Sequence, residues 1–256
     1  MRLTIVGCSG SYPGPESAAS CYLREAEHDG RTWRILLDLG NGALGQLHRY
    51  ADPLSIDAVF VSHLHADHCL DLCGYYVMRK YHPTGPQPRI PVWGPEGTAE
   101  RMARAYDLPE APGMTEEFAF MEYGSREHDG PVELGPFRVE AHQVVHPVTA
   151  FALRVTADGR TLVYSGDTGP CPALDEAAAG AHLLLAEASF QTGDDNPPDL
   201  HLTGADCGRT ASSAGVERLV LTHVPPWHDA AVAEAEARAE WSGPVELARA
   251  GATYEV

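Results

Sequence analysis

Three histidines and an aspartate lie within six residues of each other, and this cluster constrains the chain more than any other feature of its sequence. The cluster, H-x-H-x-D-H, directly follows the apolar run at 58–62, which is typical of a buried strand. Imidazole and carboxylate groups are the ligands that zinc and similar metals prefer. His63 and His65 project to the same side of an extended loop, whereas Asp67 and His68 lie where the chain turns into a helix. Because four residues placed in this way do not easily converge on one ion, the cluster predicts two adjacent metal ions.

Three further polar residues follow apolar runs later in the chain. His146 follows a pair of valines, and Asp167 and His223 follow the runs at 161–165 and 218–222. Any one of them alone is typical of a capping or solvent-facing residue. All three in this order, behind H-x-H-x-D-H, favour ligands that strand ends deliver to one shared site.

The hydrophobic pattern alternates between short strands and amphipathic helices. Apolar, β-branched runs predict strands at 2–7, 33–38, 58–62, 150–155, 161–165, 183–187 and 218–222. The patterns between them predict helices at 42–50, 68–80, 96–106, 203–214 and 229–240. The segment 157–160 predicts a hairpin turn of the Asp-Gly type, and the segment 81–91 predicts a surface loop, with a lid over a site as the alternative. Strand-rich halves covered by helices predict an α/β fold of two packed sheets with helices outside.

Charge and composition limit the partners of the chain. A formal net charge of −18 argues against nucleic acid as a partner, because tRNA or duplex DNA requires a basic surface. A small anionic substrate stays compatible, since bound metal cations invert the local field. The six cysteines form no C-x-x-C pair, which argues against a disulfide framework or a zinc ribbon. Without a signal peptide pattern or a run long enough to span a bilayer, we expect a single cytoplasmic domain, 1–256, and no membrane partner.

The order H-x-H-x-D-H, His, Asp, His resembles the metallo-β-lactamase superfamily over nearly the whole chain. The resemblance implies a four-layer αββα sandwich and two divalent ions, with zinc expected and Mn²⁺ or Fe²⁺ also compatible. One ion would be bound by His63, His65 and His146, and the other by Asp67, His68 and His223. Asp167 would bridge the two ions. Two such ions can activate a water and stabilise the leaving oxygen of a phosphoryl or acyl group.

Further stretches resemble the ribonuclease Z branch of this superfamily. They include the N-terminal "VGCSGSYPGPESAASCYL", the segment "ILLDLGNGALGQL" with Asp38, and "LLLAEASF" with Glu187. The stretch that begins at His201 resembles the segment where a histidine precedes a helix and the last ligand strand. By this resemblance His201, held and kept protonated by Glu187, would stabilise charge and protonate a leaving group. Asp67 would orient the attacking water, so the predicted catalytic residues are Asp67, His201 and Glu187.

The chain departs from ribonuclease Z in one segment. The tRNA-binding arm of bacterial members lies between the third motif and the bridging aspartate, whereas His146 and Asp167 are only 21 residues apart here. The chain is therefore similar to arm-less members of the branch, among them atypical bacterial cyclic-nucleotide phosphodiesterases. This resemblance implies a dinuclear phosphodiesterase acting on a small phosphodiester such as a 3′,5′-cyclic nucleotide, for example cAMP, and it suggests a homodimer.

Three alternative functions stay open at this point. The first is tRNA 3′-end endonuclease activity. The second is hydrolysis of a lactone or thioester, since the same seven ligands suit acyl chemistry, although Glu187 and His201 argue against it. The third is a non-catalytic binding protein on the same scaffold, against which the intact ligand set argues.

Overall fold

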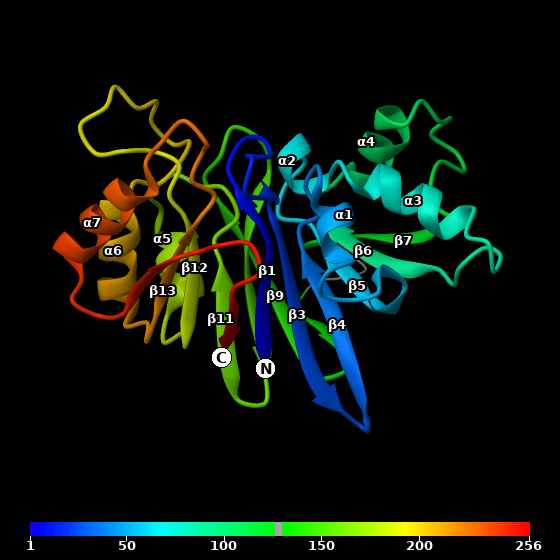
Figure 1. Ribbon diagram of the computed structural model, residues 1–256, viewed down its shortest axis with the longest axis horizontal. Coiled ribbons are helices and arrows are strands. Elements are labelled where there is room, and N and C mark those ends of the chain that lie inside the picture. Colours follow the sequence, from blue (N-terminus) through cyan, green and yellow to red (C-terminus); the bar gives the residue numbers. More distant parts are fainter. Residues whose placement is uncertain (126–129) are drawn as a thin grey trace.

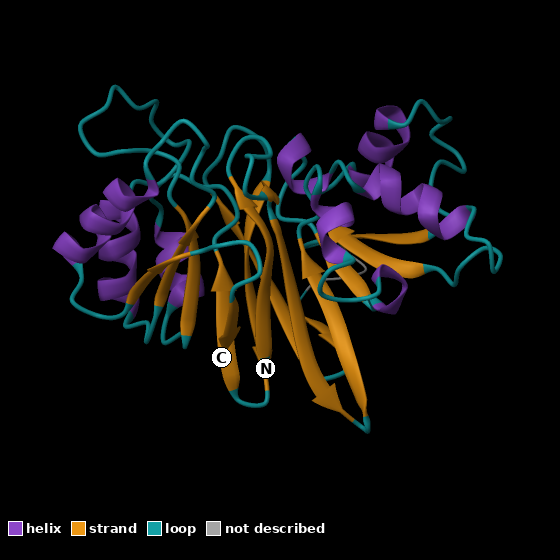
Figure 2. Ribbon diagram, viewed as in Figure 1, coloured by secondary structure: helices purple, strands orange, loops and turns teal. Residues whose placement is uncertain are grey.

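Two β-sheets face each other in the computed structural model, which describes residues 1–125 and 130–256. Figures 1 and 2 show helices on the outer side of each sheet. An apolar core, with Leu3, Phe60 and Leu185 among its members, fills the space between the sheets. This four-layer arrangement is the αββα sandwich that the sequence predicted.

The first sheet has the strand order β15-β1-β3-β4-β5-β6-β7, and the short β2 pairs with β1. Within the described residues its strands are β1 (Arg2–Ser9), β2 (Ala18–Ala19), β3 (Cys21–His28), β4 (Arg31–Leu37), β5 (Ala58–Phe60), β6 (Ile90–Gly94), β7 (Phe118–Glu122) and β15 (Thr253–Glu255). The second sheet has the order β14-β13-β12-β11-β10-β9-β8. Its strands are β8 (Val132–Leu134), β9 (Phe137–Val144), β10 (Ala150–Ala157), β11 (Arg160–Tyr164), β12 (Leu183–Glu187), β13 (Leu219–Thr222) and β14 (Val245–Leu247).

Each sheet is apolar on both faces because its outer face is covered by helices. Successive side chains of a strand point to opposite faces, so Tyr22 of β3 enters the core between the sheets while Leu23 packs under the helices. The helices on the first sheet are α1 (Ala43–Leu47), α3 (Leu72–Lys80) and α4 (Thr98–Ala105). Those on the second sheet are α5 (Pro172–Ala178), α6 (Gly204–Ala214) and α7 (Ala230–Glu240). Two shorter elements, η1 (Pro53–Ser55) and α2 (Ala66–Cys69), complete the described helices.

The seven predicted strands and five predicted helices are present, with one difference in detail. The hairpin at Asp158 and Gly159 is confirmed, since both residues have positive φ angles of 54° and 72°, as a two-residue hairpin turn requires. The predicted helix 68–80 is two helices, α2 and α3, which a short break separates. At this break the backbone N–H of Asp71 donates to Leu39 and its carboxylate accepts from Leu44, so the chain is anchored to the strand end beside it.

The segment 81–91 is a surface loop that ends as β6 begins, as predicted. It lies at the outer end of α3, far from α2 and the loops at the upper edge of the sandwich (Figure 1). Gln87 and Pro88 of this loop line a separate surface cavity of about 500 Å³. Its position does not fit the alternative of a lid over the histidine cluster.

The two ends of the sandwich differ. Both termini lie side by side at the lower end in Figure 1, where β15 pairs antiparallel with β1. The loops that follow β5, β11 and β13 gather at the opposite end, together with α2. Among the described residues, no helix has the length and apolar character needed to cross a membrane.

Candidate metal centre

All seven predicted metal ligands lie together at the upper end of the sandwich. His63 follows β5, His65 and the start of α2 come next, His146 follows β9, Asp167 follows β11 and His223 follows β13. The structure brings them into two groups, whose ligand atoms lie within 4.8 Å of one another: His63, His65, His146 and Asp167, and Asp67, His68, Asp167 and His223. Asp167 belongs to both groups, which is the bridging position that the sequence predicted for it.

The first group surrounds a point between three imidazoles and one carboxylate. Nδ1 of His65 lies 3.0 Å from Nε2 of His63 and 3.3 Å from Nε2 of His146. Oδ2 of Asp167 lies 3.7 Å from Nε2 of His63. In a tetrahedral zinc site with metal–ligand distances of 2.0–2.1 Å, neighbouring ligand atoms are about 3.3 Å apart. The observed separations therefore have the size that one ion at their centre requires.

The second group has the same dimensions. Nε2 of His68 and Nε2 of His223 are 3.0 Å apart, and Oδ2 of Asp67 lies 3.4 Å from the first and 3.1 Å from the second. Oδ1 of Asp167 lies 3.3 Å from His68 Nε2 and 3.5 Å from His223 Nε2. The two oxygens of Asp167 thus face different groups.

The hydrogen bonds of the imidazoles show which nitrogen carries the proton. Nδ1 of His68 lies 2.7 Å from Oδ2 of Asp38, and Nδ1 of His146 lies 2.9 Å from the carbonyl oxygen of Leu200. A carbonyl or carboxylate oxygen only accepts, so Nδ1 must donate in both rings, and whenever such a ring is neutral its lone pair is on Nε2. Ser62 donates to Asp38 and so accepts from Nδ1 of His63, which leaves the same Nε2 lone pair on that ring.

Nε2 of His63 and Nε2 of His68 face the carboxylate of Asp167, and a bound cation would compensate this concentration of acceptor atoms. Oδ1 of Asp167 is buried and has no hydrogen-bond donor among the described residues. Such an unpartnered buried oxygen is costly unless a cation meets it. The donor set, the separations and this orphaned oxygen all fit a pair of divalent ions.

The electrostatics of the cluster point the same way. Burial alone would raise the pKa of Asp167, but His223, His68 and His63 outweigh it and hold that pKa well below the ordinary value. Burial opposes the shift of Asp67 in the same way, and the neighbouring rings of His223 and His68 lower its pKa. Burial also acts against a proton on His68, yet Asp167 and Asp38 raise the pKa of that ring well above its usual value. Two ionised carboxylates thus draw positive charge into this place.

Glu187 and His201, the predicted second pair, lie beside the cluster and contact each other. Oε1 of Glu187 lies 2.8 Å from Nδ1 of His201, and the carboxylate also accepts from the backbone N–H groups of Thr168 and Ser189. Burial lowers the pKa of His201, but Glu187 outweighs it and raises the pKa to about 9. The ring centroid of His201 is 5.5 Å from that of His146, so this pair adjoins the first group.

Three residues not among the predicted site residues, Asp38, Tyr164 and Gly40, also shape the centre. The fully buried carboxylate of Asp38 accepts from Ser62 N at 2.6 Å, Ser62 Oγ at 2.8 Å, His68 Nδ1 at 2.7 Å and Tyr164 OH at 2.8 Å. The sequence pointed to Asp38 only as part of a matched segment and gave no signal for Tyr164.

Gly40 matters as well, since a Cβ there would lie 1.9 Å from the carbonyl oxygen of Asp67. Only glycine lets the end of β4 approach the ligand loop this closely.

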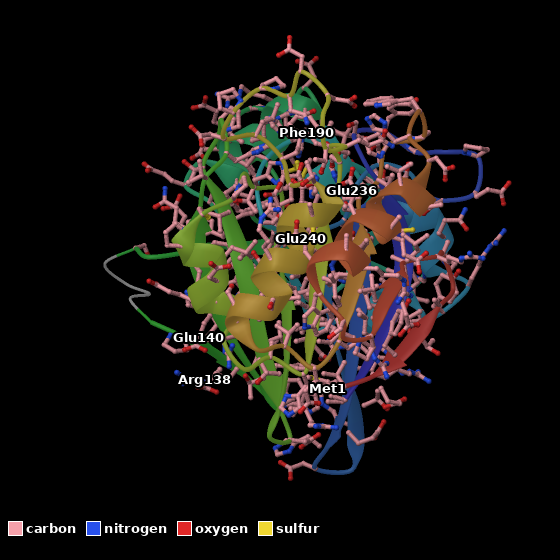
Figure 3. The ribbon with its side chains drawn as sticks, turned by 90° about the vertical axis from the view of Figure 1, so that its left-hand side faces the viewer. Met1, Arg138, Glu140, Phe190, Glu236 and Glu240 are labelled. Carbon is pink, nitrogen blue, oxygen red and sulfur yellow. The ribbon has the colours of Figure 1, made fainter. Side chains whose placement is uncertain are left out.

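Phe190 marks the rim of the centre. Its ring stands edge-on to that of His201, with the two ring centroids 5.0 Å apart. Figure 3 places Phe190 at the end of the molecule where the loops gather. The long loop that follows it carries the exposed acidic residues Asp194, Asp195 and Asp199. The surroundings of the centre on this side are therefore negatively charged.

Comparison with known proteins identifies the family. A family model described as the β-lactamase superfamily domain matches residues 33–224, which contain all nine predicted site residues. The chain belongs to this superfamily. It is a metal-dependent hydrolase, and its His/Asp clusters are suited to binding metal ions.

Relatives within the superfamily cover the whole chain. The uncharacterized protein Rv1339 of Mycobacterium tuberculosis is 43% identical over 259 residues, which are 100% of this chain and 92% of that protein. Ribonuclease Z of Myxococcus xanthus is 30% identical and aligns over 100% of this chain and 98% of its own length. The crystal structure of the metallo-β-lactamase fold protein YhfI of Bacillus subtilis superimposes with a TM-score of 0.86 at 27% identity, covering 99% of both chains. The superfamily member is thus related to ribonuclease Z, as predicted.

Proposed function

We propose that this superfamily member hydrolyses a small phosphodiester, namely a 3′,5′-cyclic nucleotide such as cAMP. The observation that carries the proposal is the contact of Glu187 with His201 directly beside the two ligand groups. A phosphodiester with an alkoxide leaving group needs a proton donor at that oxygen, and an acyl hydrolase of this fold does not obviously need such a pair.

In the proposed reaction, a water attacks phosphorus in line with the leaving ribose oxygen. The new bond joins the water oxygen to phosphorus as the bond from phosphorus to the ribose oxygen breaks, and the proton that the water loses passes to the solvent. Asp67 orients the water, and His201 donates the proton that converts the leaving oxygen into a hydroxyl. Glu187 holds Nδ1 of His201, which leaves Nε2 as the nitrogen free to meet the substrate. Two divalent ions held by the seven ligands would supply Lewis-acid polarisation of the phosphoryl group and lower the pKa of a water.

Two features support a small substrate over an RNA. The connection from His146 to Asp167 consists of the tight hairpin β10–β11, so no arm for gripping tRNA is inserted there. The chain carries a net charge of −18, and the loop beside the centre adds exposed aspartates. A polyanion would be repelled over its whole length, whereas a single phosphodiester meets mainly the local field of the centre.

A turnover panel on protein of known metal content tests this proposal. The substrates are cAMP, cyclic GMP, bis-p-nitrophenyl phosphate, a precursor tRNA and a lactone, and the His63→Ala variant is the blank. We expect cleavage of a cyclic nucleotide that the variant loses. Cleavage of the precursor tRNA in preference to the nucleotides would favour ribonuclease Z activity, which the relationship to the Myxococcus xanthus enzyme keeps as the competing function. Lactone turnover with inert phosphodiesters would refute the assignment of Glu187 and His201.

Three further properties belong to the same proposal. The zinc expected from the ligand types is checked by metal analysis of protein purified without added metal, with manganese and iron(II) as the alternatives. The predicted homodimer is checked by light scattering. The assignment of the seven ligands is checked by the loss of bound metal when each is replaced by alanine.

A further inference from the structure

Ser189 is buried behind His223 and contacts it twice. Its Oγ lies 2.8 Å from Nδ1 of His223 and 2.9 Å from the carbonyl oxygen of the same residue. Its backbone N–H donates to Oε2 of Glu187 at 3.0 Å. Only 2% of Ser189 is exposed to solvent, so water cannot readily replace these contacts.

The single hydroxyl proton of Ser189 decides which nitrogen of His223 is protonated. The carbonyl oxygen of His223 can only accept, so the hydroxyl of Ser189 must donate its proton to that oxygen. The lone pair of Oγ then accepts from Nδ1–H of His223. The proton on Nδ1 leaves Nε2 with a lone pair, and Nε2 is the atom that lies 3.0 Å from His68 and 3.1 Å from Asp67.

The same contact holds a backbone conformation that is uncommon for histidine. His223 has a φ of +57°, in the left-handed region that residues other than glycine seldom adopt. Its N–H donates to the carbonyl of Cys8, and its carbonyl oxygen accepts from Ser189. On the neighbouring strand end a Cβ at Gly10 would lie 2.1 Å from that carbonyl oxygen, so the backbone around His223 is packed closely. Ser189 therefore fixes both where the ring of His223 stands and which nitrogen it presents.

We propose that Ser189 is a positioning residue that orients His223 toward the second ligand group and connects this ligand to Glu187. The rings of three other ligands, His68, His63 and His146, obtain their Nδ1 partner from Asp38, Ser62 and a main-chain carbonyl, respectively. Ser189 supplies that partner for His223. Partners of this kind affect metal affinity by roughly 10–100-fold. The inference rests on the proposed metal ligands and is independent of which phosphodiester is the substrate.

The test compares Co²⁺ and Zn²⁺ binding by the full-length protein, Ser189→Ala, Ser189→Thr and the control Thr98→Ala. Thr98 is also a buried hydroxyl residue, but it donates to Pro95 at the start of α4, remote from the centre. We expect Ser189→Ala to bind one of its two ions about 10–100-fold more weakly and the other with unchanged affinity. Threonine keeps the hydroxyl and should restore the lost affinity, and Thr98→Ala should bind both ions normally.

Equal affinity of the wild type and Ser189→Ala for both ions would overturn the proposal. Equal weakening of both sites would overturn it too, because it would indicate general loosening of the fold. A wild-type protein that binds no divalent ion would refute the metal centre itself, and the inference with it. Nitrogen-15 NMR of the histidines in the wild type does not depend on how the variants fold. We expect the ring of His223 to be the Nδ1–H tautomer. An Nε2–H tautomer in the metal-loaded protein would contradict the proposal.

Discussion

The contact between Glu187 and His201 makes a quantitative prediction about pH. In the wild type the Glu187 carboxylate raises the pKa of His201 to about 9, so that about 97% of this residue is protonated at pH 7.5. Glu187→Gln keeps a hydrogen-bond acceptor of the same shape but removes the negative charge. Without that charge, burial, which lowers the pKa of the ring, is opposed mainly by Asp167, which raises it, and we expect a pKa near the ordinary value of about 6.5.

The consequence is a loss of activity on the basic side of the pH profile. With a pKa of about 6.5, only about a tenth of His201 carries the proton at pH 7.5, so kcat for cAMP should fall about tenfold or more. The basic limb of the pH–rate profile should move from about pH 9 to about pH 6.5, and near pH 6 the difference between the two proteins should shrink. The activity falls on the basic side because the protonated ring of His201 is the active form, and in the variant this ring loses its proton at a lower pH.

A comparison of leaving groups separates this effect from a damaged active site. p-Nitrophenolate leaves readily as an anion and does not need a proton, so bis-p-nitrophenyl phosphate should lose little activity in Glu187→Gln. In His201→Ala, kcat for cAMP should fall about 10²–10⁴-fold, while the fall for bis-p-nitrophenyl phosphate should stay under about tenfold. Glu240→Gln removes the same charge from α7, on the outer face of the second sheet (Figure 3), and is the matched control. An unshifted profile for Glu187→Gln, or equal losses on both substrates, would refute the reasoning.

Three further predictions concern stability and long-range charge. Asp38→Asn places an amide group against four hydrogen-bond donors; the loss of about two charge-assisted bonds should cost roughly 3 kcal/mol and lower the Tm by roughly 6–12 °C in calorimetry. A fall of less than about 2 °C would contradict this account. Burial lowers the pKa of Arg24 to about 9, and none of its side-chain nitrogens has a partner among the described residues. Arg24→Met should therefore raise the free energy of unfolding, measured in urea, by about 1–3 kcal/mol. A clear loss of stability would contradict this prediction. Finally, kcat/KM for cAMP should rise with added salt, because the net charge of −18 repels an anion and salt screens it, whereas activity on tRNA that depends on basic contacts would fall with salt.

The predictable part of the centre is the part that side-chain chemistry makes visible in sequence. Each ligand ends or follows an apolar strand run, and the carboxyl ends of β5, β11 and β13 meet at one end of the sandwich. The spacing H-x-H-x-D-H then places His63 and His65 on the loop and Asp67 and His68 on α2, as the sequence predicted. What the sequence could not provide is the set of groups behind the ligands. The Leu200 carbonyl is a backbone group, and backbone groups carry no residue signal.

The missed secondary structure has a similar physical origin. β3 and β9 were not predicted because their runs contain charged and polar residues, such as Arg24, Glu25 and Glu140, which obscure the apolar alternation. The β-sheet pairing with β1 and β10 decides these strands, and such long-range pairing is not encoded in local propensity. The break between α2 and α3 likewise depends on contacts of Asp71 with Leu39 and Leu44, which lie about 30 residues away in sequence.

The hydrogen bonds around the centre suggest why its imidazoles need partners as much as they need ligands. Nε2 of His68 and Nε2 of His223 lie 3.0 Å apart. If one of the two rings rotated or changed its tautomer, the rings would form a hydrogen bond with each other and close the space between them. Asp38 behind one ring and Ser189 behind the other prevent this, because each holds the Nδ1 side of its ring and so keeps Nε2 directed inward. The space that these two partners hold open is also bordered by the ionised carboxylates of Asp67 and Asp167. In the proposed function, binding of a phosphodiester anion by this acidic chain would therefore depend on cations, and Asp38 and Ser189 would contribute to it through the ligands that they orient.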